Sequence, residues 1–239
     1  MIRFIILLLT VSNISNLYAQ ITYREISEMR IVPTNPDSAL MRLSEIEPRL
    51  VASNDSAKFA YYLHVGQVYT IKQDYEKAIK YNELARSFAE NINLIDGDYV
   101  FVMHKLMNAY FNNDDPKSAN RIAEWTITRC GYVLENHRLS SDVYWMLGMT
   151  LGRLGDYDYI HDVQQKGFQL AQKFFTKNDP QYYFNLVHLY NVYVHYIKDS
   201  DKAAETANII LGYLNDAKPK SDNEEKYFSK IRALLTTEN

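Results

Sequence analysis

Glycine, proline and cysteine are scarce in this chain of 239 residues, which contains 8 Gly, 6 Pro and 1 Cys. A β-sandwich of this length would need far more turn-forming residues, so the composition argues against that class and favours long helices. The single cysteine, Cys130, permits no internal disulfide, and its apolar neighbours predict a buried, inert thiol. Stability therefore has to come from packing.

An excess of positive charge is also missing, because the formal net charge is -3. A nucleic-acid-binding protein needs cations to neutralise phosphates, so we expect no nucleic-acid partner. Beyond the N-terminus, no apolar run approaches the roughly 20 residues that span a bilayer, which predicts no stable membrane insertion. Hydrophobic residues make up 47% and charged residues 23%, values typical of a folded soluble domain.

The N-terminal residues 1–19 have the pattern of a signal peptide. Arg3 precedes an apolar run of eight residues, Phe4 to Val11, and the segment ends in Leu17-Tyr18-Ala19. The run is too short to span a membrane, although a retained membrane anchor is the alternative to cleavage after Ala19. The pattern predicts an exported protein, located in the periplasm or outside the cell.

Residues 61–85 contain two apolar helical faces separated by a short polar turn, Lys72-Gln73-Asp74. The first face consists of Tyr62, Val65, Gly66 and Tyr69, and the second of Tyr75, Ala78, Ile79, Asn82 and Ala85. The small residues Gly66 and Ala78 are expected where the two helices approach most closely. In this spacing of aromatic and small residues around a turn, the segment resembles a tetratricopeptide repeat (TPR).

The same layout returns three times with polar turns near residues 113–116, 155–157 and 198–201. The matching apolar positions Val65, Leu106, Leu147 and Leu189 are spaced by 41, 41 and 42 residues, more than the roughly 34 of a standard TPR. Met107 and Tyr190 replace the small residue of the signature. An irregular helical bundle with the same 3.6-residue periodicity is the alternative.

The resemblance implies an all-α, right-handed α-α solenoid of about four to five TPR-like hairpins with a C-terminal capping helix. We expect one domain over residues 20–239. Its hairpins are predicted roughly at 21–52, 55–94, 97–136, 139–177 and 179–216, and the cap at 221–237. Asn35-Pro36 is a typical helix start within the first hairpin, and Ile231, Leu234 and Leu235 share one face of the cap.

In TPR proteins, the first helix of each repeat lines a concave groove that holds a partner. The corresponding positions here are Leu63, Gln67, Thr70 and Ile71; His104, Asn108, Phe111 and Asn112; Trp145, Met149 and Arg153; and Val187, Asn191, Val194 and His195. The amides could pair with a peptide backbone, the aromatic and Met side chains could supply apolar contact, and Arg153 could pair with a carboxylate. The alternative is that these side chains only pack against one another or face water.

No motif indicates catalysis, a metal or a cofactor. The zinc-protease pattern HExxH does not occur, and His188 and His195, seven residues apart, lack an identifiable third ligand. Gly148, Gly152 and Gly155 match neither the dinucleotide fingerprint nor a phosphate-binding loop. We therefore predict a non-catalytic scaffold that binds a protein or peptide. The alternatives are a sensor or regulatory input module of a signalling system, or an accessory protein to an envelope or polysaccharide-handling enzyme.

Overall fold

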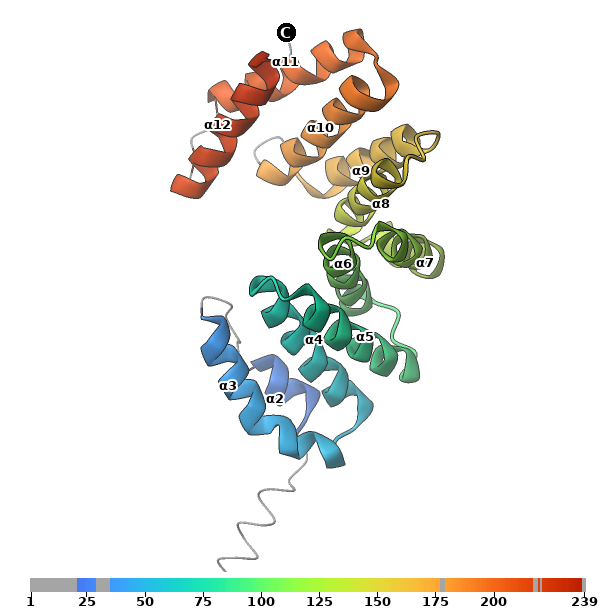
Figure 1. Cartoon of the computed structure of the whole chain (residues 1–239), viewed down its shortest axis with the longest axis vertical. Coiled ribbons are helices and arrows are strands. Elements are labelled where there is room, and N and C mark those ends of the chain that lie inside the picture. Colours follow the sequence, from blue (N-terminus) through green and yellow to red (C-terminus); the bar gives the residue numbers. More distant parts are fainter. Residues whose placement is uncertain (1–20, 29–34, 177–178, 217–218, 220, 238–239) are drawn as a thin grey trace, which may run out of the picture. The chain divides into compact units, whose positions relative to one another are not determined.

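The computed structural model describes residues 21–28, 35–176, 179–216, 219 and 221–237, a succession of helices joined by short turns (Figure 1). These residues form no strand, which confirms the predicted all-α class. The predicted signal peptide, residues 1–19, lies outside the described residues. The chain divides into two compact units, one ending at Ile122 and the other starting at Ala123, and this boundary falls inside a helix, α7 (Pro116–Leu134).

The first unit has a buried apolar cluster formed by its N-terminal helices. Its elements are α2 (Tyr23–Glu28), α3 (Pro36–Ile46), the 3₁₀ helix η1 (Glu47–Ala52), α4 (Asp55–Ile71), α5 (Tyr75–Asn91), α6 (Gly97–Asn112) and the start of α7. Ile26 of α2 and Leu43 of α3 are almost fully buried in one cluster with Val65 and Val68 of α4. Each such side chain contributes roughly 1.5–3 kcal/mol when fully buried, so α2 and α3 are integral to the unit.

Helix-capping side chains fix the ends of the first clear hairpin, α4–α5. Asn54 accepts a hydrogen bond from the backbone N–H of Ala57, and Asp74 accepts one from that of Lys77. Between the helices, Gln73 adopts a positive φ of 59°, which reverses the chain within the predicted turn. The two helices therefore pack side by side, as Figure 1 shows.

Gly66 of α4 makes room for an amide side chain of α5. A Cβ atom at this position would lie 2.5 Å from Oδ1 of Asn82, which is fully buried and donates from Nδ2 to the carbonyl of Ala78 at 2.8 Å. The sequence predicted close approach at Gly66 and Ala78. The structure shows that the space beside the glycine is filled by Asn82.

A stack of aromatic rings joins the same two helices. The ring of Tyr62 lies nearly parallel to those of Tyr81 and Phe88, with centroids 6.2 and 5.5 Å away, and Tyr69 stacks on Tyr81 at 5.4 Å. Offset stacking of this kind adds to the energy of area burial. These tyrosines are therefore packing residues, as their helical spacing indicated.

The second unit continues the succession of hairpins. It contains the rest of α7, then α8 (Ser140–Leu154), α9 (Ile160–Phe174), α10 (Pro180–Val192), the π-helical turn η2 (Tyr193–Ile197), α11 (Ser200–Asp216) and α12 (Asp222–Thr237). Cys130 of α7 is buried, as predicted. One apolar cluster unites α10, α11 and α12, and within it Tyr183 stacks on Tyr213 with ring centroids 3.5 Å apart.

The α8–α9 hairpin repeats the arrangement found at Gly66. A Cβ atom on Gly148 would lie 2.0 Å from Nε2 of Gln164, which is buried and donates to the carbonyl of Trp145 at 3.3 Å. The helix ends at Gly155, whose φ of 75° is the left-handed conformation that glycine adopts without strain. Close packing therefore accounts for Gly148, and the turn accounts for Gly155.

The fourth hairpin contains a wide turn that the sequence did not indicate. Residues Tyr193–Ile197 form a single π-helical turn after α10, and Lys198 follows with a φ of 59°. Asp199 then caps α11 by accepting a hydrogen bond from the backbone N–H of Lys202. The π turn inserts one residue per turn relative to an α-helix, so it changes which side chains share a face.

Candidate functional site: cavities on the first helices of the hairpins

In the first unit, a cavity of 200 Å³ lies between successive first helices of the hairpins, α2, α4 and α6. We call it the α2–α4–α6 cavity. It is lined by Tyr23, Ser27, Ala60, Leu63, His64, Gln67, Asp98 and Phe101. Three consecutive first helices contribute to it, which is the arrangement that the groove hypothesis requires.

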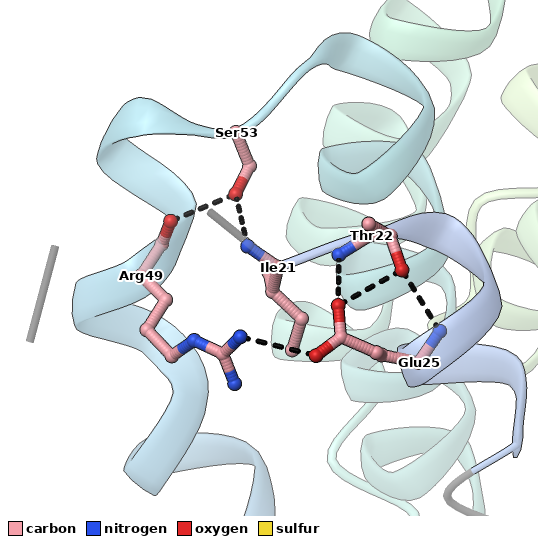
Figure 2. Close-up of polar contacts among 5 residues, drawn as sticks. All are labelled: Ile21, Thr22, Glu25, Arg49 and Ser53. Atoms are coloured by element: carbon pink, nitrogen blue, oxygen red, sulfur yellow. Dashed lines mark hydrogen bonds and ion pairs between the residues drawn. The ribbon is translucent and has the colours of Figure 1, made fainter. Parts of the chain in front are cut away.

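Polar contacts at the N-terminus of α2 hold this helix against the rest of the first unit (Figure 2). Ser53 accepts from the backbone N–H of Ile21 at 3.0 Å and donates to the carbonyl of Arg49 at 2.7 Å. Thr22 and Glu25 exchange hydrogen bonds in a capping box, and Arg49 donates to Glu25 at 3.1 Å. The backbone N–H of Thr22, its hydroxyl and Arg49 lower the pKa of Glu25. These bonds place Tyr23 and Ser27 at the cavity.

A hydrogen bond from Tyr23 to Asp98 connects α2 with α6. The phenol donates to Oδ2 of Asp98 at 2.7 Å, and this bond, with burial, raises the pKa of Tyr23. Asp98 lies in the first turn of α6, where the helix dipole also favours a carboxylate. The bond therefore defines one wall of the α2–α4–α6 cavity.

A second, smaller cavity of 140 Å³ continues along α4 and α6 and is lined by Gln67, Thr70, Ile71 and Lys105. We call it the α4–α6 cavity. Gln67 lines both cavities, so they adjoin at this side chain. Together they carry one anionic and one cationic side chain, Asp98 and Lys105.

The predicted groove residues of the first unit fall into two groups. Leu63, Gln67, Thr70 and Ile71 line these cavities. His104 instead packs inward: its Nδ1 is buried, has no hydrogen-bond partner in the described part of the chain, and burial lowers its pKa to about 4. Farther along α6, Asn108 accepts hydrogen bonds from Asn112, and Phe111 is half-buried. None of these last four residues lines either cavity as described.

In the second unit, a cavity of 360 Å³ is lined mainly by the first helices α8 and α10 and the π turn η2, with one residue each from α9 and the C-terminal helix α12. We call it the α8–α10–α12 cavity. Its lining residues are Gly148, Met149, Gln164, His188, Asn191, Val192, His195, Tyr196 and Leu234. Tyr196 stacks on the exposed Tyr157, with ring centroids 5.0 Å apart.

Aromatic rings surround His188 in the wall of this cavity. Its imidazole lies 4.6 Å from the ring of Trp145 and 4.4 Å from that of Phe184, measured between centroids. Burial lowers the pKa of His188 to about 3, so the ring is neutral at neutral pH. Its Nε2, like Nε1 of Trp145, is buried without a hydrogen-bond partner among the described residues. Buried polar atoms usually have a partner, so these two nitrogens are exceptional among the described residues.

Three predicted groove residues of the second unit, Met149, Asn191 and His195, line this cavity. Trp145 lies behind it, against His188, and Arg153 is exposed at the end of α8. The π turn separates Val194 from Asn191 and His195: Val194 lines a different cavity, of 300 Å³, with Tyr190, Tyr193 and Lys198. Val187 is buried in the core.

Several cavity residues were not predicted from the sequence. Tyr23 and Ser27 belong to α2, a short helix without a strong apolar pattern. Asp98, Phe101 and Lys105 of α6 line the cavities although they are not signature positions of the repeat. Leu234 was assigned only to the capping helix. The signal that could have identified it is its position in α12, the helix that follows the last hairpin.

Within the described residues, no group of three or more His, Cys, Asp or Glu side chains is placed to hold a metal ion. None of the described helices is both long and apolar enough to cross a membrane.

No family model matches the chain, and no curated protein matches it. Solved structures do match. A Podosopora anserina protein with nearly identical TPR-like repeats of the kinesin light chain type superposes with a TM-score of 0.63 at 14% identity, covering 80% of this chain and 92% of that one. A single-substitution variant of that protein gives 0.61 at 14% identity, covering 80% and 91%. The fold is TPR-like. At this identity, the TPR-like match establishes the architecture alone.

Proposed function

We propose that the protein is a non-catalytic TPR-like scaffold that binds an extended segment of a protein partner on the first helices of its hairpins. The observation that carries the proposal is the position of the cavities, which lie between successive first helices in both units. In the first unit, two cavities adjoin at Gln67, which gives a continuous surface along α4 and α6. Cavities with a few polar groups in an apolar lining are typical of binding sites.

Retention of a partner by the full chain, purified from the cells that produce it, tests this proposal. A Gln67→Trp substitution would fill the point where the two cavities of the first unit adjoin, whereas Val51→Trp adds the same side chain at an 84% exposed position outside them. We expect a specific protein to be retained by the unmodified chain and by Val51→Trp, and lost with Gln67→Trp. Identical retention by all three proteins, or none by any, would contradict the proposal.

We also propose that the protein is exported and acts in the periplasm or outside the cell. The support is the signal-peptide pattern of residues 1–19. N-terminal sequencing of the protein isolated from the cell envelope or medium should begin at Gln20. A chain that keeps Met1 and remains in the cytoplasm would contradict export, and one that keeps Met1 in a membrane fraction would favour the anchor alternative.

A further inference from the structure

The α8–α10–α12 cavity differs from an ordinary groove surface in its lining, which lacks carboxylate, ammonium and guanidinium groups as far as the structure describes it. Its nine lining residues, as the structure describes them, include no Asp, Glu, Lys or Arg. His188 is neutral because it is buried among aromatic rings. A charged group that entered this cavity would lose its hydration without gaining an ion-pair partner, so the cavity favours an uncharged ligand group.

Polar atoms without partners are present beside apolar ones. The Nε2 of His188 is buried without a partner, and the amide of Asn191 makes no side-chain hydrogen bond within the described part of the chain. The amide of Asn191, which lines the cavity, can both accept and donate. Met149, Val192 and Leu234 supply apolar surface, and a Met sulfur makes favourable contacts with aromatic rings.

From this combination, we propose that the α8–α10–α12 cavity binds the side chain of a tyrosine of the partner, an inference that rests on the proposed function. Interface anchors are enriched in Trp, Tyr and Arg. The uncharged lining disfavours Arg, and the indole N–H of Trp can only donate. A phenol presents an apolar ring to Met149 and a hydroxyl that both donates and accepts, which matches the amide of Asn191. A volume of 360 Å³ is at the small end of the roughly 300–1,000 Å³ of ligand pockets, suitable for one side chain.

Small-molecule probes test this inference by NMR on the full chain. The chain contains two tryptophans: the indole N–H of Trp145 adjoins His188, whereas Trp125 is 47% exposed on α7 and serves as an internal control. p-Cresol should shift the Trp145 signal in a saturable way and leave Trp125 unchanged. Toluene, which lacks the hydroxyl, should bind about tenfold more weakly, the effect of losing one hydrogen bond.

Two further probes decide between ligand classes. 3-Methylindole should bind more weakly than p-cresol, and acetate should not bind. Methyl α-glucopyranoside tests a neutral sugar: if it shifts Trp145 and p-cresol does not, the tyrosine inference is overturned. Equal binding of p-cresol and toluene would also overturn it, because the polar atoms would then play no part.

Matched variants test whether p-cresol binds in the α8–α10–α12 cavity. Met149→Trp should fill the cavity and abolish p-cresol binding, whereas Met41→Trp, at a 59% exposed site on α3, should not. If circular dichroism shows that Met149→Trp fails to fold, Asn191→Leu replaces it and should remove the preference for p-cresol over toluene. Failure of p-cresol to bind, while the partner is still retained by the unmodified chain and lost with Gln67→Trp, would refute this inference and leave the proposed function intact.

Discussion

In the first unit, Asp98 and Lys105 line the cavities along α4 and α6, whereas no Asp, Glu, Lys or Arg lines the α8–α10–α12 cavity of the second unit as far as the structure describes it. Both sites occupy the same position in the TPR-like hairpin, between first helices. The packing of the hairpin fixes the positions that face the partner and leaves their chemistry free. A partner that contacts both units would therefore meet a carboxylate and an ammonium group on one, and a pocket whose described lining has no Asp, Glu, Lys or Arg on the other.

Inside the hairpins, in contrast to the cavities, packing restricts which side chains can occupy a position. In both units, a signature glycine receives an amide side chain 16 residues later: Asn82 for Gly66, and Gln164 for Gly148. In the fourth hairpin, Tyr190 stands at the glycine position and the smaller Thr206 lies 16 residues later, and both are buried. In the fourth hairpin, a larger side chain thus replaces the glycine and a smaller one replaces the amide, as close packing of this position would require.

The largest expected effect on stability comes from a substitution that removes the electrostatic contrast between the units. Val192→Asp would place a carboxylate beside neutral His188, where only 3% of Val192 is exposed, and should lower the free energy of unfolding by about 3 kcal/mol at pH 7. Gln67→Asp, in the half-buried polar cavity lining of the first unit, should change it by less than about 1 kcal/mol. Urea unfolding of both variants measures the difference.

The pH dependence of the Val192→Asp variant gives a second check. Burial raises the pKa of the new carboxyl in the folded state above its unfolded value of about 3.9. The folded state then binds more protons, so the stability deficit should be small near pH 4 and grow as the pH rises toward 7. A deficit of equal size at both pH values would indicate a steric cause instead of charge burial.

A smaller effect is expected from filling the glycine contacts. Gly148→Ala should cost about 1–3 kcal/mol and Gly66→Ala somewhat less, because the new Cβ would lie 2.0 Å from Gln164 and 2.5 Å from Asn82. Gly212→Ala is the matched control in α11, where a Cβ would meet no atom within 4 Å, and should stabilise by up to about 1 kcal/mol.

A double-mutant cycle separates this contact from helix propensity. In a Gln164→Ala background, Gly148→Ala should lose most of its cost, which denaturant unfolding would measure. Additive effects of the two substitutions would contradict the explanation by contact.

A modest effect is expected at the wall of the first-unit cavity. Tyr23→Phe removes the hydrogen bond to Asp98 and should cost about 0.5 kcal/mol, because the pair is largely exposed. Since the folded-state pKa of Tyr23 is raised, its contribution is present below about pH 10 and is lost as the pH rises through the folded pKa. Stability curves of the two proteins should converge at the alkaline end, and parallel curves would contradict this account.

The smallest effect on global stability concerns the capping box shown in Figure 2. Thr22→Ala removes the hydroxyl that pairs with Glu25, and should act mainly through local fraying of α2, because the pair is exposed to solvent. Hydrogen exchange of the backbone amide of Ile26 should accelerate, while amides of α5 keep their protection. Unchanged exchange at Ile26 would show that burial of its side chain alone holds α2 in place.

The sequence located the helical hairpins because polar turns interrupt apolar faces. The turn Lys72-Gln73-Asp74 lies between the end of α4 at Ile71 and the start of α5 at Tyr75. Gly155 was likewise expected in a turn and has the left-handed backbone that favours glycine. Fold class follows from such local signals, which depend on residues close together in the chain.

The cavities could be predicted only in part. Gln67, Met149 and Asn191 line cavities as their signature positions implied, but His104 faces inward and Val194 lines a different cavity. The inward packing of His104 depends on its tertiary surroundings, and the π turn that moves Val194 leaves no mark in an apolar periodicity of 3.6. The division into two units was also not visible, because residues 122 and 123 both lie within α7, whose non-helical residue, Cys130, comes later.

Site-specific photocrosslinking in the producing cells tests the central claim most directly. A photoreactive side chain at Gln67 or Asn191 would lie in a cavity of one unit each, and one at Val51 or Tyr132, which are 84% and 86% exposed, would lie outside the cavities described. The scaffold account predicts covalent adducts with the same protein from both cavity positions and none from the two controls. Adducts that form equally at all four positions, or only at the controls, would contradict it.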